Sequence, residues 1–229
     1  LETSSDRRAQ GAYYTPPDVV EFLVEETLGA LLRPWEDALP KASRRRCLTL
    51  LRQAQELKLL DPACGGGAFL LGALTRLRQF YARLAGRFEI LGKGTPEVLA
   101  APGRLALAET LRGVDIDGHA LALAELALLA AVSDEPDHGA SRRLIGTSLR
   151  RGDHLDFGWQ REAFAPVFAR RNPGFDVLIG NPPYAPLLPA QLSRLREAGF
   201  KSLDAKDIYV FFVEAIEHNT RRQGHAGFI

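Results

Sequence analysis

The feature that most constrains the fold is a short apolar run that ends in a polar residue and is followed by a turn and a helix-forming stretch. It occurs at residues 58–61, 111–115 and 175–181, and more weakly at 147–151 and 226–229. Strands that alternate with helices are typical of a mostly parallel, doubly wound α/β sheet with helices on both faces. Ligands of such sheets bind beyond the carboxyl ends of the strands. The residues just after each run are therefore the first candidates for a functional site.

Apolar residues also recur with helical spacing outside these runs. The spacing predicts helices over about 16–32, 43–57, 68–84 and 119–132. Thr15 precedes two prolines and an aspartate, so we expect its side chain to cap the first of these helices.

The composition is that of an ordinary globular protein. The chain has 229 residues, of which 46% are hydrophobic and 25% are charged, and its net charge is +1. A domain that held DNA by charge alone would be far more basic. The cysteines, Cys47 and Cys64, suggest no disulfide framework and fit a reducing, cytoplasmic setting. No apolar run is long enough for a membrane helix, so we expect no membrane partner.

The turn after the first run contains three consecutive glycines. Asp61, Ala63 and Cys64 lead into Gly65 and two further glycines. Glycine allows positive φ angles and lets a ligand approach the backbone closely. The Lys-Ser/Thr pair of a phosphate loop is absent, which favours a ligand without phosphates. An ordinary strand-to-helix turn is the alternative interpretation of this segment.

Acidic residues follow three neighbouring runs. Asp61 ends the first run, Asp115 ends the second, and Asp153 follows the third. An acid at the tip of the second strand commonly accepts hydrogen bonds from both hydroxyls of a ribose, and Asp153 could accept from an adenine amino group. Asp117 is better placed to cap the next helix. Each acid alone is more often a solvated loop residue, but together they predict a nucleoside pocket.

The fourth run leads directly into Asn181, Pro182, Pro183 and Tyr184. Two prolines stiffen the backbone and remove its donors, so the segment presents acceptors and one aromatic ring. The carbonyls of Asn181 and Pro182 can both accept from one planar NH2 group, whose lone pair is otherwise delocalised. Holding that nitrogen in a pyramidal geometry is catalysis by positioning and electrostatics. The alternative is a proline-stiffened surface loop.

Taken together, these motifs resemble those of an S-adenosylmethionine-dependent amino-methyltransferase. The matching segments are 61–70, 114–117 and 179–184. With Tyr-Tyr-Thr-Pro-Pro at 13–17 and Asp-Ile-Tyr-Val-Phe-Phe at 207–212, their order resembles the gamma class of DNA adenine-N6 methyltransferases, and most closely the methylase domains of type IIG-like restriction-modification enzymes.

The resemblance covers about residues 11–229 and implies a Rossmann-like methyltransferase fold. It implies an N-terminal helical segment, residues 1–57, packed on a catalytic domain, residues 58–229. Because relatives carry a longer sheet and the chain ends at Ile229, we expect the fold to be truncated after the fifth strand.

The resemblance also implies roles for individual residues, and no metal. Thr15 would bind the carboxylate end of the cofactor and Ile116 would pack on its adenine. The residues that would hold the target base are Asn181, Pro182, Pro183 and Tyr184. The residues that would bind S-adenosylmethionine are Tyr14, Thr15, Asp61, Ala63, Cys64, Gly65, Asp115, Ile116, Asp153, His154 and Asn181. Asp207, Tyr209 and Phe211 would lie near the cofactor and the back of the pocket.

The partner that the resemblance implies is duplex DNA with an adenine flipped out, because the amino group is otherwise buried in the base pair. DNA would be gripped mainly by a target-recognition domain that is missing from this chain, and a restriction or specificity subunit or a fused nuclease would be a further partner. Two alternatives remain open. One is an amino-methyltransferase that acts on a protein glutamine or an RNA base, and the other is a non-catalytic cofactor-binding scaffold of a restriction complex.

Overall fold

The structure, a computed structural model, describes residues 15–92, 94–135 and 138–229. Within them lies one parallel sheet in the order β3-β2-β1-β4-β5. Its strands are β1 (Leu59–Asp61), β2 (Leu111–Asp115), β3 (Leu149–Arg151), β4 (Phe175–Gly180) and β5 (Thr220–Phe228). The predicted doubly wound α/β fold is confirmed.

The larger hydrophobic core covers one face of the sheet. Leu59, Val177 and Ile179 point into it, because alternate residues of a strand face opposite sides. The elements that supply the rest of this layer are α2 (Pro17–Val24), the π-helix η1 (Glu25–Gly29), α3 (Ala30–Ala38), η2 (Leu39–Lys41), α4 (Arg44–Glu56), α5 (Ala68–Ile90), η3 (Glu97–Ala100), α6 (Pro102–Glu109), α7 (Gly118–Ala131) and α8 (His138–Ser148).

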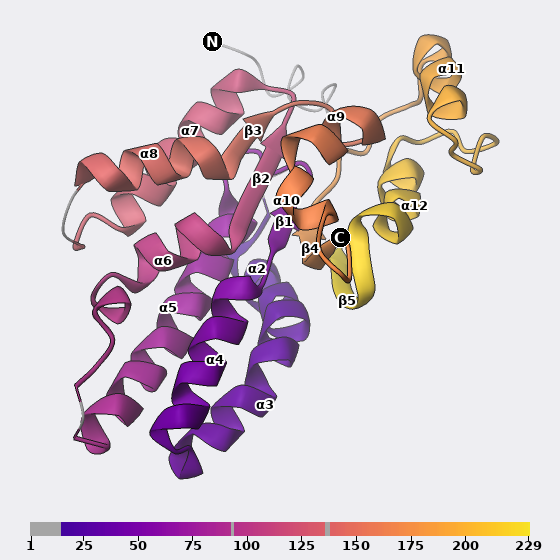
Figure 1. Cartoon of the computed structure of the whole chain (residues 1–229). Coiled ribbons are helices and arrows are strands. Elements are labelled where there is room, and N and C mark those ends of the chain that lie inside the picture. Colours follow the sequence, from indigo (N-terminus) through magenta and orange to yellow (C-terminus); the bar gives the residue numbers. More distant parts are fainter. Residues whose placement is uncertain (1–14, 93, 136–137) are drawn as a thin grey trace.

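The second face carries a smaller core. Leu60, Val114 and Leu178 point to this side and pack with Phe164 and Phe175. The helices here are α9 (Phe157–Ala163), α10 (Ala165–Phe168) and α12 (Tyr209–Asn219). Helix α11 (Pro189–Glu197) stands away from the sheet at the upper right of Figure 1. The two layers leave the carboxyl ends of the strands as the edge on which a ligand site can form.

The opposite edge of the sheet is tied together by a buried carboxylate. Asp176, at the start of β4, accepts a hydrogen bond from the backbone nitrogen of Lys58 at 2.8 Å. It also pairs with Arg170 at 3.2 Å and with Arg221. These contacts join the beginnings of β1, β4 and β5, so we assign this edge a structural role.

The structure corrects three local expectations. Thr15 does not cap α2: the residue at the cap position is Pro16, and no side chain bonds to the helix start. The first helix does not end near residue 32 but continues to residue 38 through η1, where the Thr27 hydroxyl donates to the Leu23 carbonyl at 2.6 Å. The last strand begins at Thr220 rather than at residue 226. Its first half is polar and therefore lacks the apolar run by which a buried strand is identified.

In the described part of the chain, no helix is both long enough and apolar enough to cross a bilayer.

Candidate functional site

The glycine turn connects β1 to α5 and is open where a ligand would need space. Gly65 and Gly67 have φ angles of 50° and 86°, so the predicted positive φ angles are confirmed at these two positions. A Cβ atom on Gly67 would lie 3.1 Å from the Cβ atom of Ala124 in α7. The absence of a side chain at Gly67 therefore allows α7 to pack closely against the turn. Apart from the adjoining residues, no atom of the described part of the chain lies within 4 Å of a Cβ atom built on Gly65 or Gly66. The turn therefore presents exposed backbone at its tip.

The carboxylate of Asp115 organises the ends of β1 and β2. One oxygen accepts from the Gly65 nitrogen at 2.8 Å and the other from the Asp117 nitrogen at 2.9 Å. Asp117 accepts from the His119 nitrogen at 2.8 Å, which confirms its predicted role as the cap of α7. Between them, Ile116 is 69% exposed. An acid and an exposed aliphatic side chain thus stand together beside the glycine turn.

Ala63 and Cys64, which precede the glycines, pack toward the interior of the protein. Burial, reinforced by the nearby carboxyl groups of Asp61 and Asp115, raises the pKa of the Cys64 thiol far above its usual range. The thiol is therefore neutral and packs as a small apolar group, with its Sγ close to Gly113 of β2. Ala63 packs partly buried against the cluster that includes Phe211 and Phe212.

Asp61 is buried at the junction of β1 and β4. Its Oδ1 accepts from the Ala63 nitrogen at 3.2 Å, and a Cβ atom on Gly180 would come within 2.7 Å of the same oxygen. Gly180 is therefore required for β4 to approach this carboxyl group. Burial, reinforced by the negative charge of Asp115, raises the pKa of Asp61 to about 8. The carboxyl group is consequently protonated at neutral pH in the ligand-free protein.

We predict that this proton makes stability depend on pH. Asp61 titrates near 4 when unfolded and at about 8 when folded. The protonated group's contribution to the free energy of unfolding is fully present below pH 4. It is lost as the pH rises toward 8, by at most about 1.4 kcal/mol per pH unit. Asp61→Asn replaces the titrating group with a neutral amide, so this decrease is absent in the variant. The free energy of unfolding of the variant, relative to that of wild type, should therefore be higher at pH 8 than at pH 5. Thermal or urea unfolding of both proteins at the two pH values measures this change.

The matched control is Asp117→Asn, which changes an exposed carboxylate on the next loop. Its stability difference from wild type should stay constant between the same pH values. A difference for Asp61→Asn that is equally flat would show that Asp61 is ionised in the folded protein.

The side chain of Asn181 is oriented by a residue from the other end of the chain. Its Nδ2 donates to the hydroxyl oxygen of buried Thr15 at 3.4 Å, across 166 positions of sequence. Its Oδ1 is buried and has no hydrogen-bond partner within the described ranges. Leaving a buried acceptor unpaired costs about 1–3 kcal/mol, which a native fold tolerates mainly at functional sites. The amide thus holds an acceptor ready for an incoming donor.

The ring of Tyr184 stacks on that of Tyr209, the first residue of α12. Their centroids are 4.8 Å apart and the planes differ by 10°. Backbone bonds fix this arrangement, since the Ile208 nitrogen donates to the Ala185 carbonyl at 3.0 Å. Asp207 accepts from the Tyr209 nitrogen at 2.8 Å and starts the helix. Partial burial and the neighbouring Tyr209 raise the pKa of Tyr184, which is therefore a neutral phenol.

The two prolines between Asn181 and Tyr184 differ in burial, with Pro182 buried and Pro183 partly exposed. Phe211, predicted at the back of the pocket, is fully buried and contacts Phe200. The structure therefore places Tyr184 and Tyr209 together at the edge and leaves Phe211 in the core beneath them.

Asp153 and His154 lie after β3 but have different surroundings. Asp153 is partly exposed, accepts from the Leu155 nitrogen at 3.0 Å and lies 3.9 Å from Arg194 of α11. The His154 ring is buried against Phe212, and its Nδ1 lies 2.6 Å from the amide of Gln160. Burial lowers the pKa of His154 to about 3, so the ring is neutral. The structure brings Asp153 to the open edge but packs the His154 ring in the core.

The remaining predicted site residue, Tyr14, lies outside the described residues. Over the described ranges, no group of three His, Cys, Asp or Glu side chains could hold a metal ion. Sequence reasoning missed the role of Gly180, whose only signal is a glycine directly before Asn181. The remaining candidate residues that follow a strand lie at the carboxyl-end edge of the sheet, where ligands of this fold bind.

Comparison with known proteins assigns the family. Residues 109–229 match the sequence profile of the family described as Eco57I restriction-modification methylase. The chain belongs to the Eco57I restriction-modification methylase family. This assignment agrees with the resemblance inferred from the sequence motifs.

Two curated proteins are similar in sequence to this chain over most of its length. The type II methyltransferase M.PaeR7I of Pseudomonas aeruginosa is 28% identical over 236 residues, which cover 100% of this chain but 33% of that protein. The adenine-specific methyltransferase PglX of Streptomyces coelicolor is 29% identical over 217 residues, which cover 82% of this chain and 16% of that protein. This methylase chain therefore spans a third or less of the length of these relatives.

A solved structure has a similar fold. The type IIL restriction-modification enzyme MmeI, determined in complex with DNA, superimposes with a TM-score of 0.69 at 19% identity. The match covers 99% of this chain and 31% of the MmeI chain. It confirms the α/β architecture of this methylase family member.

Proposed function

We propose that this chain is the catalytic domain of an adenine-N6 DNA methyltransferase of a restriction-modification system, with S-adenosylmethionine as the methyl donor. The observation that carries the proposal is the unpaired, buried Oδ1 of Asn181, which stands at the same strand edge as Asp115 and the open glycine turn. Family membership supports it, as do a type II methyltransferase and an adenine-specific methyltransferase among the relatives.

The residues at the edge fit the proposed cofactor. The partly buried carboxylate of Asp115 can accept from two ribose hydroxyls, and the exposed Ile116 offers an apolar surface for adenine. Asp153 can accept from the adenine amino group. The partly exposed backbone at Gly65 leaves room for the methionine portion. When bound, S-adenosylmethionine supplies an electrophilic methyl group.

The Asn181–Tyr184 segment would hold the acceptor. The Asn181 Oδ1 and the Pro182 carbonyl accept from the two hydrogens of the adenine N6 amino group and direct its lone pair toward the methyl group. Thr15 keeps the amide in this orientation by accepting from its Nδ2. Tyr184 stacks on the base, and Tyr209 supports it from behind. No side chain has to remove a proton before transfer.

We further propose that the adenine reaches this edge by flipping out of duplex DNA in the cytoplasm. The net charge of +1 gives the chain little general attraction for a polyanion. We therefore assign most of the DNA grip to a target-recognition domain outside these 229 residues. A restriction subunit, a specificity subunit or a fused nuclease would then act on the same DNA.

The experiment that tests this function is transfer of labelled methyl groups from S-adenosylmethionine by the full-length protein. Duplex DNA, RNA and protein are offered separately, and the modified residue is identified by mass spectrometry. We expect N6-methyladenine in DNA. A methylated glutamine or RNA base would instead support the alternative amino acceptors. Cofactor binding without transfer to any acceptor would favour a non-catalytic scaffold.

A further inference from the structure

The turn between β2 and α7, residues 115–118, carries the exposed Ile116 side chain and is held from two sides. On the β1 side, Asp115 accepts from the Gly65 nitrogen at 2.8 Å. On the β3 side, the Gly152 nitrogen donates to the Asp115 carbonyl at 3.0 Å. Among the described residues, the partner of the Ile116 backbone is a side chain on this second side.

That side chain is Arg151, the last residue of β3. Its Nε donates to the Ile116 carbonyl oxygen at 3.1 Å. A Cβ atom on Gly118 would lie 3.8 Å from its Nη1 and 3.9 Å from its Cζ and Nε. Three guanidinium atoms at nearly equal distance mean that the flat face of the group lies over Gly118. Arg151 thus bonds the middle of the turn and covers its end.

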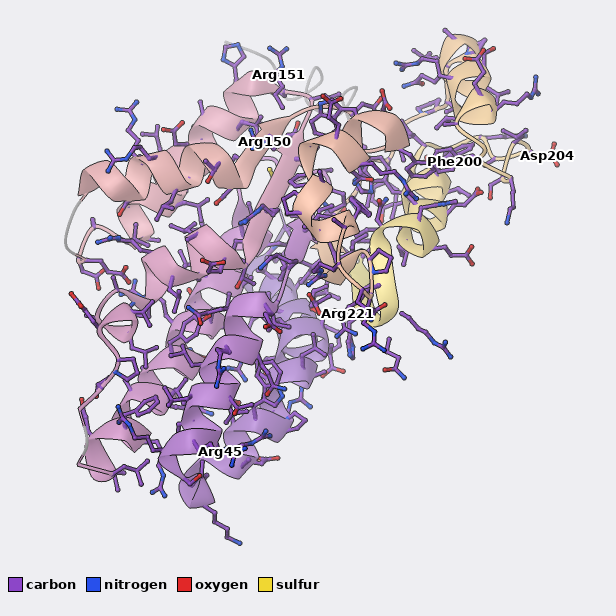
Figure 2. The ribbon with its side chains drawn as sticks, in the orientation of Figure 1. Arg45, Arg150, Arg151, Phe200, Asp204 and Arg221 are labelled. Atoms are coloured by element: carbon purple, nitrogen blue, oxygen red, sulfur yellow. The ribbon has the colours of Figure 1, made fainter. Side chains whose placement is uncertain are left out.

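The neighbouring Arg150 offers a natural comparison. It lies on the same strand, opposite Val114 of β2 as Arg151 lies opposite Asp115. Both arginines are exposed, and Figure 2 shows both at the β3 edge. Within the described residues, the Arg150 side chain makes no hydrogen bond or ion pair. The two positions therefore share charge, exposure and strand, and differ in contact with the turn.

We infer that Arg151 is a positioning residue that acts through Ile116 on the adenine end of the cofactor. A hydrogen bond from an exposed arginine to a carbonyl adds little to fold stability. Fixing the turn before the ligand arrives lowers the cost of ordering it upon binding. The inference rests on the proposed function, because it assumes that Ile116 packs on the cofactor adenine.

The test is a double-mutant cycle on the affinity for S-adenosylhomocysteine, measured by calorimetry with the whole chain. The variants are Arg151→Ala, Ile116→Ala, the double variant and Arg150→Ala. We expect Arg151→Ala to raise the dissociation constant about five- to tenfold and to leave the unfolding temperature within about 2 °C of wild type. We expect Arg150→Ala to bind like wild type.

In the Ile116→Ala background the backbone carbonyl remains, but the side chain that Arg151 positions against the adenine is removed. Arg151→Ala should therefore weaken binding by less than about twofold there. Wild-type affinity in Arg151→Ala would overturn the inference. The same loss in both backgrounds would also overturn it, because Arg151 would then act independently of Ile116. If the wild-type chain binds neither S-adenosylmethionine nor its product, the proposed function fails, and the inference fails with it.

Discussion

Asn181→Ala is expected to lower the rate of methyl transfer about a thousandfold while the protein still binds its cofactor. In the proposed mechanism, the variant removes one of two acceptors for the hydrogens of the reacting nitrogen. Losing one such preorganised hydrogen-bonding group typically costs a hundred- to a thousandfold in rate. Here the group also directs the lone pair, so we expect the upper end of that range. Initial rates at saturating substrates and a cofactor titration measure the two effects separately.

The matched control is Asn172→Ala. Asn172 is an exposed asparagine that precedes β4, and its Nδ2 donates to the Arg222 carbonyl at 3.2 Å. This variant should transfer methyl groups at the wild-type rate. If Asn181→Ala lost cofactor affinity as severely as turnover, Asn181 would belong to the cofactor site rather than to the base site.

Asp115→Ala should weaken cofactor binding about a hundredfold. The substitution removes the proposed acceptor for both ribose hydroxyls, and hydrogen bonds to a charged group contribute about 1.5–3 kcal/mol each. It also leaves the nitrogens of Gly65 and Asp117 without their acceptor, so the glycine turn keeps its backbone bond from Cys64 to Val114 but loses its bond to the Asp115 side chain. Calorimetric titration with S-adenosylhomocysteine measures the loss directly.

Asp117→Ala is the control for this prediction, because it removes an acid two residues away. Asp117 caps α7 through the His119 nitrogen, so its loss should cost about 1 kcal/mol of stability and leave cofactor affinity within about twofold of wild type. Unchanged affinity in Asp115→Ala would remove Asp115 from the ribose site.

The central strands were predictable because their sequences are unambiguous. The buried runs that form β1, β2 and β4 are short, apolar and followed by turns. The edge strand β5 was harder to predict, because its first half contains Arg221, Arg222 and Gln223, which face partly toward solvent and break the apolar pattern of a buried strand. Helix α11 could not be predicted, since it is short and packs on the core through Leu192 and Leu195 alone among its large apolar residues. Residues on the periphery need less apolar surface and so leave a weaker pattern.

The site was predictable by residue type but not by contact. Fold rules place Asp61, Asp115 and Asn181 at one edge, because the carboxyl ends of parallel strands coincide. No local pattern indicates that Thr15 bonds to Asn181 instead of capping its own helix. The burial of His154 could not be predicted from the local sequence either, because it depends on Phe212 of α12, which comes much later in the chain.

The contact between Thr15 and Asn181 has a consequence for the order in which the molecule forms. It closes a loop of 166 positions, and on one side β1 likewise pairs with the distant strand β4, through Leu59 and Val177. Long loops close late because their entropy must be spent before the contact forms. During synthesis, the glycine turn and Asp115 can fold together before residue 181 has emerged. The edge that would hold the base is therefore the last part of the site to assemble, and a nascent chain contains the cofactor half of the site before it contains a place for the acceptor.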